Sequence, residues 1–178
     1  EQWMLAITKY ADRLDKDLDE VDYPARVKTQ QRNWIGRSEG VEIGFEIVFK
    51  NGGKPGLIPV FTTRPDTIFG ATYLVFSPEH LWVALATDDN HKGVLDNALE
   101  VKNYVEGVKN KTDIDRSAEG REKTGVELKG VKAINPATKE EIPVWVADYV
   151  LSHYGTGAIM AVPAHDERDY EFAKKYEL

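Results

Sequence analysis

Residues 61–70 place several chemically active side chains directly after a stretch with the pattern of a strand. The segment reads Phe61-Thr62-Thr63-Arg64-Pro65-Asp66-Thr67-Ile68-Phe69-Gly70. Three hydroxyls, a guanidinium and a carboxylate thus follow the strand, and such groups can bind and orient a polar substrate. The alternative is an ordinary turn, in which Asp66 bonds its own backbone and Arg64 is solvated.

Residues 154–169 form a second segment that is polar where a strand should continue. It reads Tyr154-Gly155-Thr156-Gly157-Ala158-Ile159-Met160-Ala161-Val162-Pro163-Ala164-His165-Asp166-Glu167-Arg168-Asp169. Its glycines permit close approach of the backbone to a ligand, and its carboxylates lie where a strand passes into a helix. The two segments together predict a candidate pocket.

The second segment also has other interpretations. Asp166 can cap the final helix, with Asp169 taking the place of the usual glutamate in a capping box. His165 can be an ordinary surface residue. These three side chains also suit a divalent metal, but three potential ligands within five residues and no distant fourth indicate a metal site only weakly, so we predict none.

The elements that must position these segments follow from the apolar pattern. Residues 41–50 alternate as a half-buried strand, and a turn-rich stretch joins them to a second strand at 57–62, which indicates a hairpin. Further expected strands are 71–76, a hairpin over 131–146, and 158–162. Helices are expected from Ser77-Pro78-Glu79, over 94–108 and from about Glu167, with charged, mobile surface at 109–123. This order predicts an α+β fold: a partly closed, mostly antiparallel, barrel-like sheet with flanking helices.

The first forty residues have a different character. Apolar residues recur at helical spacing over residues 1–20 and predict an amphipathic helix. The helix should stop near Tyr23-Pro24, and residues 27–40 are polar and contain glycines, as expected of a connection. We therefore divide the chain into a helical arm and connector (1–40) and a main domain (41–178). A start without methionine suggests a piece of a longer protein.

Composition excludes some functions. Thirty acidic and 23 basic side chains give a formal net charge of −7, which argues against broad nonspecific attraction to nucleic acid. No cysteine is present, so disulfides and thiolate zinc sites are excluded. No apolar run approaches the ~20 residues that cross a bilayer, so we expect no membrane partner, and the cytoplasm is the default location.

The two polar segments, in this order and about ninety residues apart, resemble the threonine-rich and aspartate-bearing loops of the editing domain (connective polypeptide 1) of class I synthetases for leucine, isoleucine and valine. Asp66, where the other two enzymes usually carry glutamate, and the run 158–169 resemble the leucyl-tRNA synthetase family specifically. Asn33-Trp34-Ile35-Gly36-Arg37-Ser38-Glu39-Gly40 is similar to its connector. The signature sequences of the synthetic site are absent, and the family's domain usually runs on beyond Leu178, so a C-terminal portion is expected to be missing.

The resemblance implies hydrolysis of the ester between a noncognate amino acid and the 3′ end of tRNA(Leu), with isoleucine, valine, methionine or linear analogues as clients. It implies no cofactor in this domain, ATP and Mg belonging to the parent synthetic site, and the rest of the synthetase as a partner. Two alternatives stay open: a catalytically silent tRNA-binding module, and a free-standing trans-editing hydrolase.

The resemblance also assigns roles to single residues. Asp169 pairs with the substrate's α-ammonium, and Asp166 orients Asp169 or contacts the ribose. Thr67 matches the family's steric gate against leucine. The remaining expected site residues are the loop hydroxyls near the ester, an arginine that organises the loop or meets phosphate, two side chains that line the pocket or the adenosine site, and a further substrate-binding histidine: Thr62, Thr63, Arg64, Tyr154, Met160 and His165.

Overall fold

The computed structural model describes residues 3–53, 56–88, 93–109, 111–112, 115–116, 121–153 and 155–178. The chain divides into two compact units, Glu1–Glu39 and Gly40–Leu178. The candidate site residues all belong to the second unit, so the first is described only briefly.

In the first unit a short 3-10 helix, η1 (Ile7–Tyr10), leads into α1 (Ala11–Asp17), and α2 (Ala25–Ile35) follows. The expected helix over residues 1–20 is therefore confirmed only in part. The connection expected at 27–40 is wrong over most of its length, because its arginine, lysine and glutamine residues are good helix formers. Helix α2 ends at Gly36, whose left-handed backbone (φ 68°) is one that glycine adopts readily.

The second unit contains one six-stranded sheet with the order β2-β1-β4-β5-β3-β6. Its strands are β1 (Val41–Phe49), β2 (Gly56–Thr62), β3 (Tyr73–Phe76), β4 (Gly125–Ile134), β5 (Glu141–Ala147) and β6 (Ala158–Ala161). Among the strands of the described residues only β3 and β5 pair in parallel, so the predicted α+β fold with a mostly antiparallel sheet is confirmed.

The sheet is not closed into a barrel. Its edge strands β2 and β6 lie close to each other, but no ladder joins them within the described residues. Pro59 stands in β2 and has no N–H to donate, which restricts that strand to an edge. The nearness of the two edges matters because the two candidate segments follow β2 and β6.

Strand β3 shows how the sheet separates two apolar clusters. Leu74 and Phe76 belong to the larger cluster, while Tyr73 and Val75 belong to a smaller one that also contains Phe172. Successive side chains of a strand point to opposite faces, so the two clusters lie on the two sides of β3. All four β3 side chains are buried.

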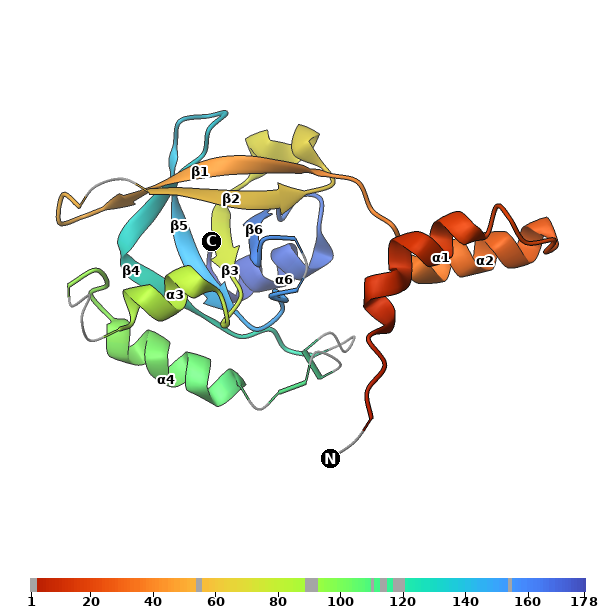
Figure 1. Ribbon diagram of the computed structural model, residues 1–178. Helices are drawn as coiled ribbons and strands as arrows, with labels where there is room; N and C mark the ends of the chain where they lie inside the picture. Colours follow the sequence, from red (N-terminus) through yellow and green to blue (C-terminus); the bar gives the residue numbers. More distant parts are fainter. Residues whose placement is uncertain are drawn as a thin grey trace. The chain divides into compact units, whose positions relative to one another are not determined.

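Three helices of the second unit cover these clusters. Helices α3 (Leu81–Ala86) and α4 (Ala98–Val108) contribute to the larger cluster, and α6 (Glu167–Tyr176) to the smaller one. Figure 1 shows α3 and α4 next to each other and apart from α6. The helix start predicted at Ser77-Pro78-Glu79 is wrong by about one turn, because the Nδ1 of His80 accepts the N–H of Trp82 and caps α3 instead.

Candidate functional site

The threonine loop, residues 62–67, follows directly on β2. Its backbone turns into a 3-10 helix, η2 (Pro65–Gly70), which begins with proline. The Thr62 Oγ1 accepts the N–H of Arg64 at 3.0 Å, and the Thr67 hydroxyl donates to the carbonyl of Arg64 at 2.9 Å. Thr67 is buried and Thr63 is exposed. Two of the three predicted hydroxyls therefore shape the loop itself.

Arg64 and Asp66 form a bidentate ion pair on this loop, with Nε–Oδ1 at 3.1 Å and Nη2–Oδ2 at 2.9 Å. The hydrogen bond from Arg64 holds the pKa of Asp66 below its ordinary value. Both side chains are 64% exposed, so the pair adds little to stability. Arg64 is thus paired with Asp66 and still largely solvated, and Asp66 also bonds its own backbone, so the contact fits both the expected role of Arg64 in organising the loop and the plain-turn alternative.

The aspartate-bearing segment follows β6 and leads into α6. Asp166 caps this helix: its carboxylate accepts the N–H groups of Arg168 and Asp169 and also pairs with the Arg168 guanidinium. The capping interpretation of Asp166 is therefore confirmed. Asp169 does not complete a capping box, because its carboxylate turns toward Val162 and Tyr149 instead.

Asp169 is 4% exposed and both of its carboxylate oxygens are held. The Tyr149 hydroxyl donates to Oδ1 at 2.9 Å, and the N–H of Val162 donates to Oδ2 at 2.8 Å. Burial raises the pKa of Asp169 to about 6, although the hydrogen bonds from Val162 and Tyr149 act in the opposite direction. Within the described residues no cation bonds to this carboxylate, so its direct contacts are two hydrogen-bond dipoles.

The fold brings the two segments together. The N–H of Thr72, just after η2, donates to the carbonyl of Ala161 at the end of β6 at 3.1 Å. A side chain added at Gly70 would lie 3.2 Å from Val162, and one at Gly155 would collide with Phe61 at 2.5 Å. Glycine is therefore needed at Gly155 for the close approach of the second segment to β2. The two segments therefore lie next to each other, and the pocket predicted between them remains a prediction.

For Met160, His165 and Tyr154 the structure does not show the predicted contacts with a substrate. Met160 is 7% exposed and packs in the larger apolar cluster, whereas Tyr73 and Tyr149, the neighbours of Asp169, belong to the smaller one. His165 is exposed, and its charge acts on Asp66. Tyr154 lies outside the described residues. The roles of these three side chains remain predictions from the sequence.

The tyrosines around Asp169 were not predicted from the sequence. Tyr149 holds the Asp169 carboxylate, and the Tyr73 hydroxyl donates to the Asp169 carbonyl at 2.8 Å. Burial raises the pKa of both phenols, so they stay protonated and can act as donors. A signal was present: Asp148-Tyr149 puts polar groups directly after a strand, as residues 62–67 do.

The segment expected as mobile charged surface at 109–123 is also different where it is described. Arg116 is buried, and its guanidinium donates to Glu79 and to the carbonyls of Asp148 and Val150. A buried arginine with partners for all its nitrogens is a fixed part of the structure. The expectation of mobile surface is therefore wrong for this residue.

The described residues can also be searched for a metal site and for a membrane-spanning helix. No group of three histidine or acidic side chains there is placed to hold a metal ion. Asp166, one of the conceivable ligands, is engaged by Arg168 and the helix terminus. None of the described helices combines the length and apolarity that crossing a membrane requires.

Fold and site together define an α+β domain with a polar site at neighbouring sheet edges, centred on a buried carboxylate. The family model for the leucyl-tRNA synthetase editing domain matches residues 32–178. Leucine–tRNA ligases of Pelodictyon phaeoclathratiforme and Chlorobium limicola are each 58% identical over 99% of this chain, which spans about a fifth (21%) of their length. The chain belongs to the leucyl-tRNA synthetase editing-domain family.

A solved structure agrees with this assignment. The LeuRS of Agrobacterium radiobacter K84, in a ternary complex with tRNA and LeuAMS, is 37% identical and matches with a TM-score of 0.69. The match covers 98% of this chain and 20% of that one. The sequence and fold comparisons thus agree on the family.

Proposed function

We propose that this domain performs post-transfer editing: it hydrolyses the ester that joins a noncognate amino acid to the 3′ end of tRNA(Leu). The observation that carries the proposal is Asp169, a buried carboxylate without a bonded cation among the described residues, in a family of editing domains. The relatives that carry the matching segment within much longer leucine–tRNA ligases support a part of a synthetase over a free-standing hydrolase.

Asp169 supplies the contact that orients the substrate. An aminoacyl ester carries a free α-ammonium group, which provides the cation that the carboxylate lacks. Each carboxylate oxygen keeps lone-pair capacity beyond its single hydrogen bond from Tyr149 or Val162. A charge-assisted contact in a buried site is stronger than one in water, so it can fix the ester for attack by water.

The threonine loop supplies groups near the ester. Among the described residues none hydrogen-bonds to the exposed Thr63 hydroxyl, so it can turn to the substrate. Thr62 and Thr67 use their oxygens to fix the loop backbone. Ordered donors and acceptors of this kind position water and stabilise the charge of a tetrahedral intermediate without a catalytic triad.

Thr67 acts as the gate that protects leucine. Leucine and isoleucine are isomers, so total size and hydrophobicity do not separate them. Leucine branches at its γ carbon and isoleucine at β, so a fixed obstacle against the γ position excludes leucine alone. Thr67 is buried, and its hydroxyl bond to Arg64 leaves the methyl group in one orientation.

Deacylation of isoleucyl-tRNA(Leu) by the full-length enzyme tests the proposal. Asp169→Ala should lower kcat/KM by roughly 100-fold, because one charge-assisted contact to the substrate is lost. Glu167→Ala is the matched control: it removes an exposed carboxylate from the same first turn of α6 and should leave the rate unchanged.

Two results would contradict this assignment. A folded Asp169→Ala variant that deacylates at the parental rate removes Asp169 from the site. A parental enzyme that binds tRNA(Leu) but never deacylates it is instead a catalytically silent binding module.

A further inference from the structure

Tyr149 occupies a constrained position two residues beyond the end of β5. It is 7% exposed, and its ring packs against Phe172 of α6 with the ring centroids 5.4 Å apart. Its hydroxyl donates to the Asp169 Oδ1 at 2.9 Å. A residue from outside α6 therefore fixes one oxygen of the carboxylate that the proposed function uses.

The residues on both sides of Tyr149 are clamped by a single side chain. Arg116 donates from Nε to the carbonyl of Asp148 at 2.7 Å and from Nη2 to the carbonyl of Val150 at 2.6 Å. Its third nitrogen pairs with Glu79 at 2.7 Å. The planar guanidinium makes these contacts as one rigid fork, so the backbone around Tyr149 has little freedom.

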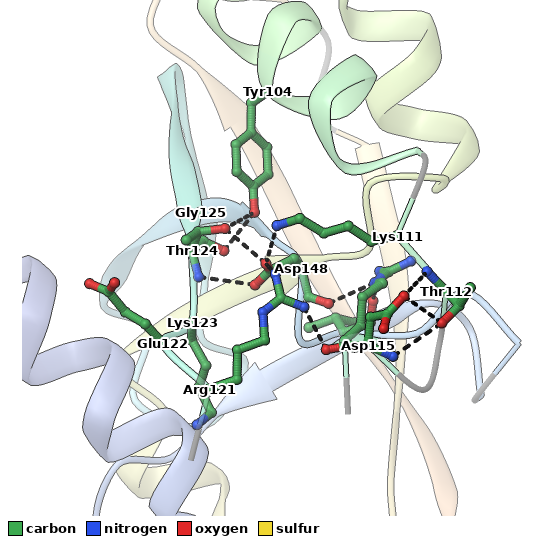
Figure 2. Close-up of polar contacts among 12 residues, drawn as sticks. Tyr104, Lys111, Thr112, Asp115, Arg121, Glu122, Lys123, Thr124, Gly125 and Asp148 are labelled. Atoms are coloured by element: carbon green, nitrogen blue, oxygen red, sulfur yellow. Dashed lines mark hydrogen bonds and ion pairs between the residues drawn. The ribbon is translucent and has the colours of Figure 1, made fainter. Parts of the chain in front are cut away.

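The Asp148 side chain anchors the same backbone a second time. Its carboxylate accepts the N–H and the hydroxyl of Thr124 at 3.0 and 2.9 Å, and it pairs with Lys111 and Arg121 at 3.2 and 3.0 Å. Figure 2 shows these groups gathered around Asp148, with the Tyr104 hydroxyl on Thr124. The cluster ties the end of β5 to the start of β4 and to Lys111 and Arg121.

We propose that Tyr149 is a positioning residue for editing: it orients the Asp169 carboxylate toward the substrate's α-ammonium, and the clamp made by Arg116 and Asp148 holds Tyr149 in place. The proposal rests on the proposed function. Tyr149 acts through Asp169 and does not contact the reacting atoms itself.

The geometry explains why a hydroxyl is needed. Tyr149 holds Oδ1 while the backbone of Val162 holds Oδ2, so the plane of the carboxylate is fixed at two points. Without the first contact the carboxylate can rotate about its Cβ–Cγ bond, and its free lone pairs lose their fixed direction. The cost of losing such alignment falls on the rate of the chemical step.

The same hydroxyl favours the ionised carboxylate. Its hydrogen bond lowers the pKa of Asp169, against the larger effect of burial and the repulsion from Asp166, while Arg168 acts in the same direction as the hydroxyl. Tyr73 is the other titratable group of this cluster, with its oxygen 3.4 Å from that of Tyr149. Loss of the Tyr149 hydroxyl should therefore raise the pKa of Asp169 further above its ordinary value.

The test compares two tyrosine variants in the full-length enzyme by the pH dependence of kcat/KM for deacylation of isoleucyl-tRNA(Leu). In the parent, kcat/KM should fall below about pH 6 as Asp169 takes up a proton. Tyr149→Phe should move this acid limb upward by about one pH unit and lower the plateau about tenfold. Tyr73→Phe is the matched control: it removes a neighbouring hydroxyl that bonds to the Asp169 carbonyl and contacts the Tyr149 hydroxyl but does not bond to the Asp169 carboxylate, so its acid limb should stay in place.

Superimposable profiles for Tyr149→Phe and Tyr73→Phe, both still sensitive to Asp169→Ala, would overturn the positioning role and leave the proposed function intact. Absence of deacylation by the parent would overturn the proposed function itself. Arg116→Lys keeps the charge and Tyr149 but cannot span both carbonyls, so it should shift the limb in the same direction. An unshifted profile for folded Arg116→Lys would contradict the clamp, and it covers the case in which Tyr149→Phe fails to fold.

Discussion

Asp148 and Asp169 are both buried, at 2% and 4% exposure, yet their surroundings differ. The Asp148 carboxylate meets two cations, Lys111 and Arg121, besides the groups of Thr124. The Asp169 carboxylate receives only an amide and a phenol hydrogen bond, and within the described residues no cation bonds to it.

The difference separates a structural carboxylate from one suited to binding. Removal of a charge from water costs several kcal/mol, and a buried ion needs a partner to recover it. Asp148 already has its partners inside the protein. Asp169 carries the penalty as a pKa raised to about 6, and a substrate ammonium is the group that would relieve it.

The largest effect, a loss of stability, is expected when the paired carboxylate of Asp148 is removed. Asp148→Ala leaves Lys111 and Arg121 without their partner and frees the backbone beside Tyr149. These cations are 34% and 28% exposed and can turn to water, so we expect a loss of roughly 3 kcal/mol, at the lower end for a broken buried pair. Urea unfolding measures it, and a loss below that of exposed Asp96→Ala would contradict the structural role.

The next largest effect is expected from Thr67, the residue proposed as the gate against leucine. If Thr67 is the proposed gate, Thr67→Ala removes the obstacle against the leucine γ branch and leaves Asp169 in place, so leucyl-tRNA(Leu) should become a substrate. Loss of a clash worth about 2–3 kcal/mol raises cognate hydrolysis about 30- to 150-fold. Rates on leucyl- and isoleucyl-tRNA(Leu), measured side by side, distinguish this outcome from loss of the Thr67–Arg64 turn bond, which would slow both.

Asp169→Asn tests how much stability the protein loses by burying the ionised Asp169 carboxylate without a cation. Since its pKa in the folded state lies near 6 and its ordinary value near 3.8, folded protein holds a proton between these pH values that unfolded protein has lost. The parent should therefore lose about 2 kcal/mol of stability as pH rises from 4 to 7, and the variant should lose less. Asparagine can still accept from Val162 and donate to Tyr149. Parallel stability–pH curves for both proteins would show that Asp169 carries no penalty.

The sequence predicted those elements that local pattern determines. Strand β1 alternates as expected, with Phe45 and Ile47 buried and Glu46 exposed between them. The cap of α6 at Asp166 was also readable, because aspartate accepts N–H groups from the next turn. At His80 the same logic failed, since a histidine nitrogen replaced the expected serine hydroxyl.

Only the two polar segments of the site could be predicted from the sequence; the residues that support them could not. The two polar segments are contiguous in sequence, so their composition marks them. Tyr149 bonds to Asp169 across a separation of 20 residues, and the sheet order β5-β3-β6 brings them together. Arg116 bonds to the carbonyls on both sides of Tyr149 from a more distant part of the chain. The charge of residues 109–123 indicated surface, because nothing local shows that the carbonyls of Asp148 and Val150 would bury Arg116.

The smallest effect on stability and rate is expected from Asp166→Ala. This substitution would leave a cation free to act on Asp169, as cations act on Asp148. Loss of the cap on α6 costs about 1 kcal/mol of stability. The substitution also removes a neighbouring negative charge that raises the pKa of Asp169, and it frees the Arg168 guanidinium, whose charge lowers that pKa. Both changes favour the ionised carboxylate, so the acid limb of kcat/KM should move below pH 6, opposite in direction to Tyr149→Phe. Arg168→Ala is the control, because it keeps the cap and removes the cation, so its limb should move upward. Equal upward shifts in both variants would mean that the charge at Asp166 does not set the ionisation of Asp169.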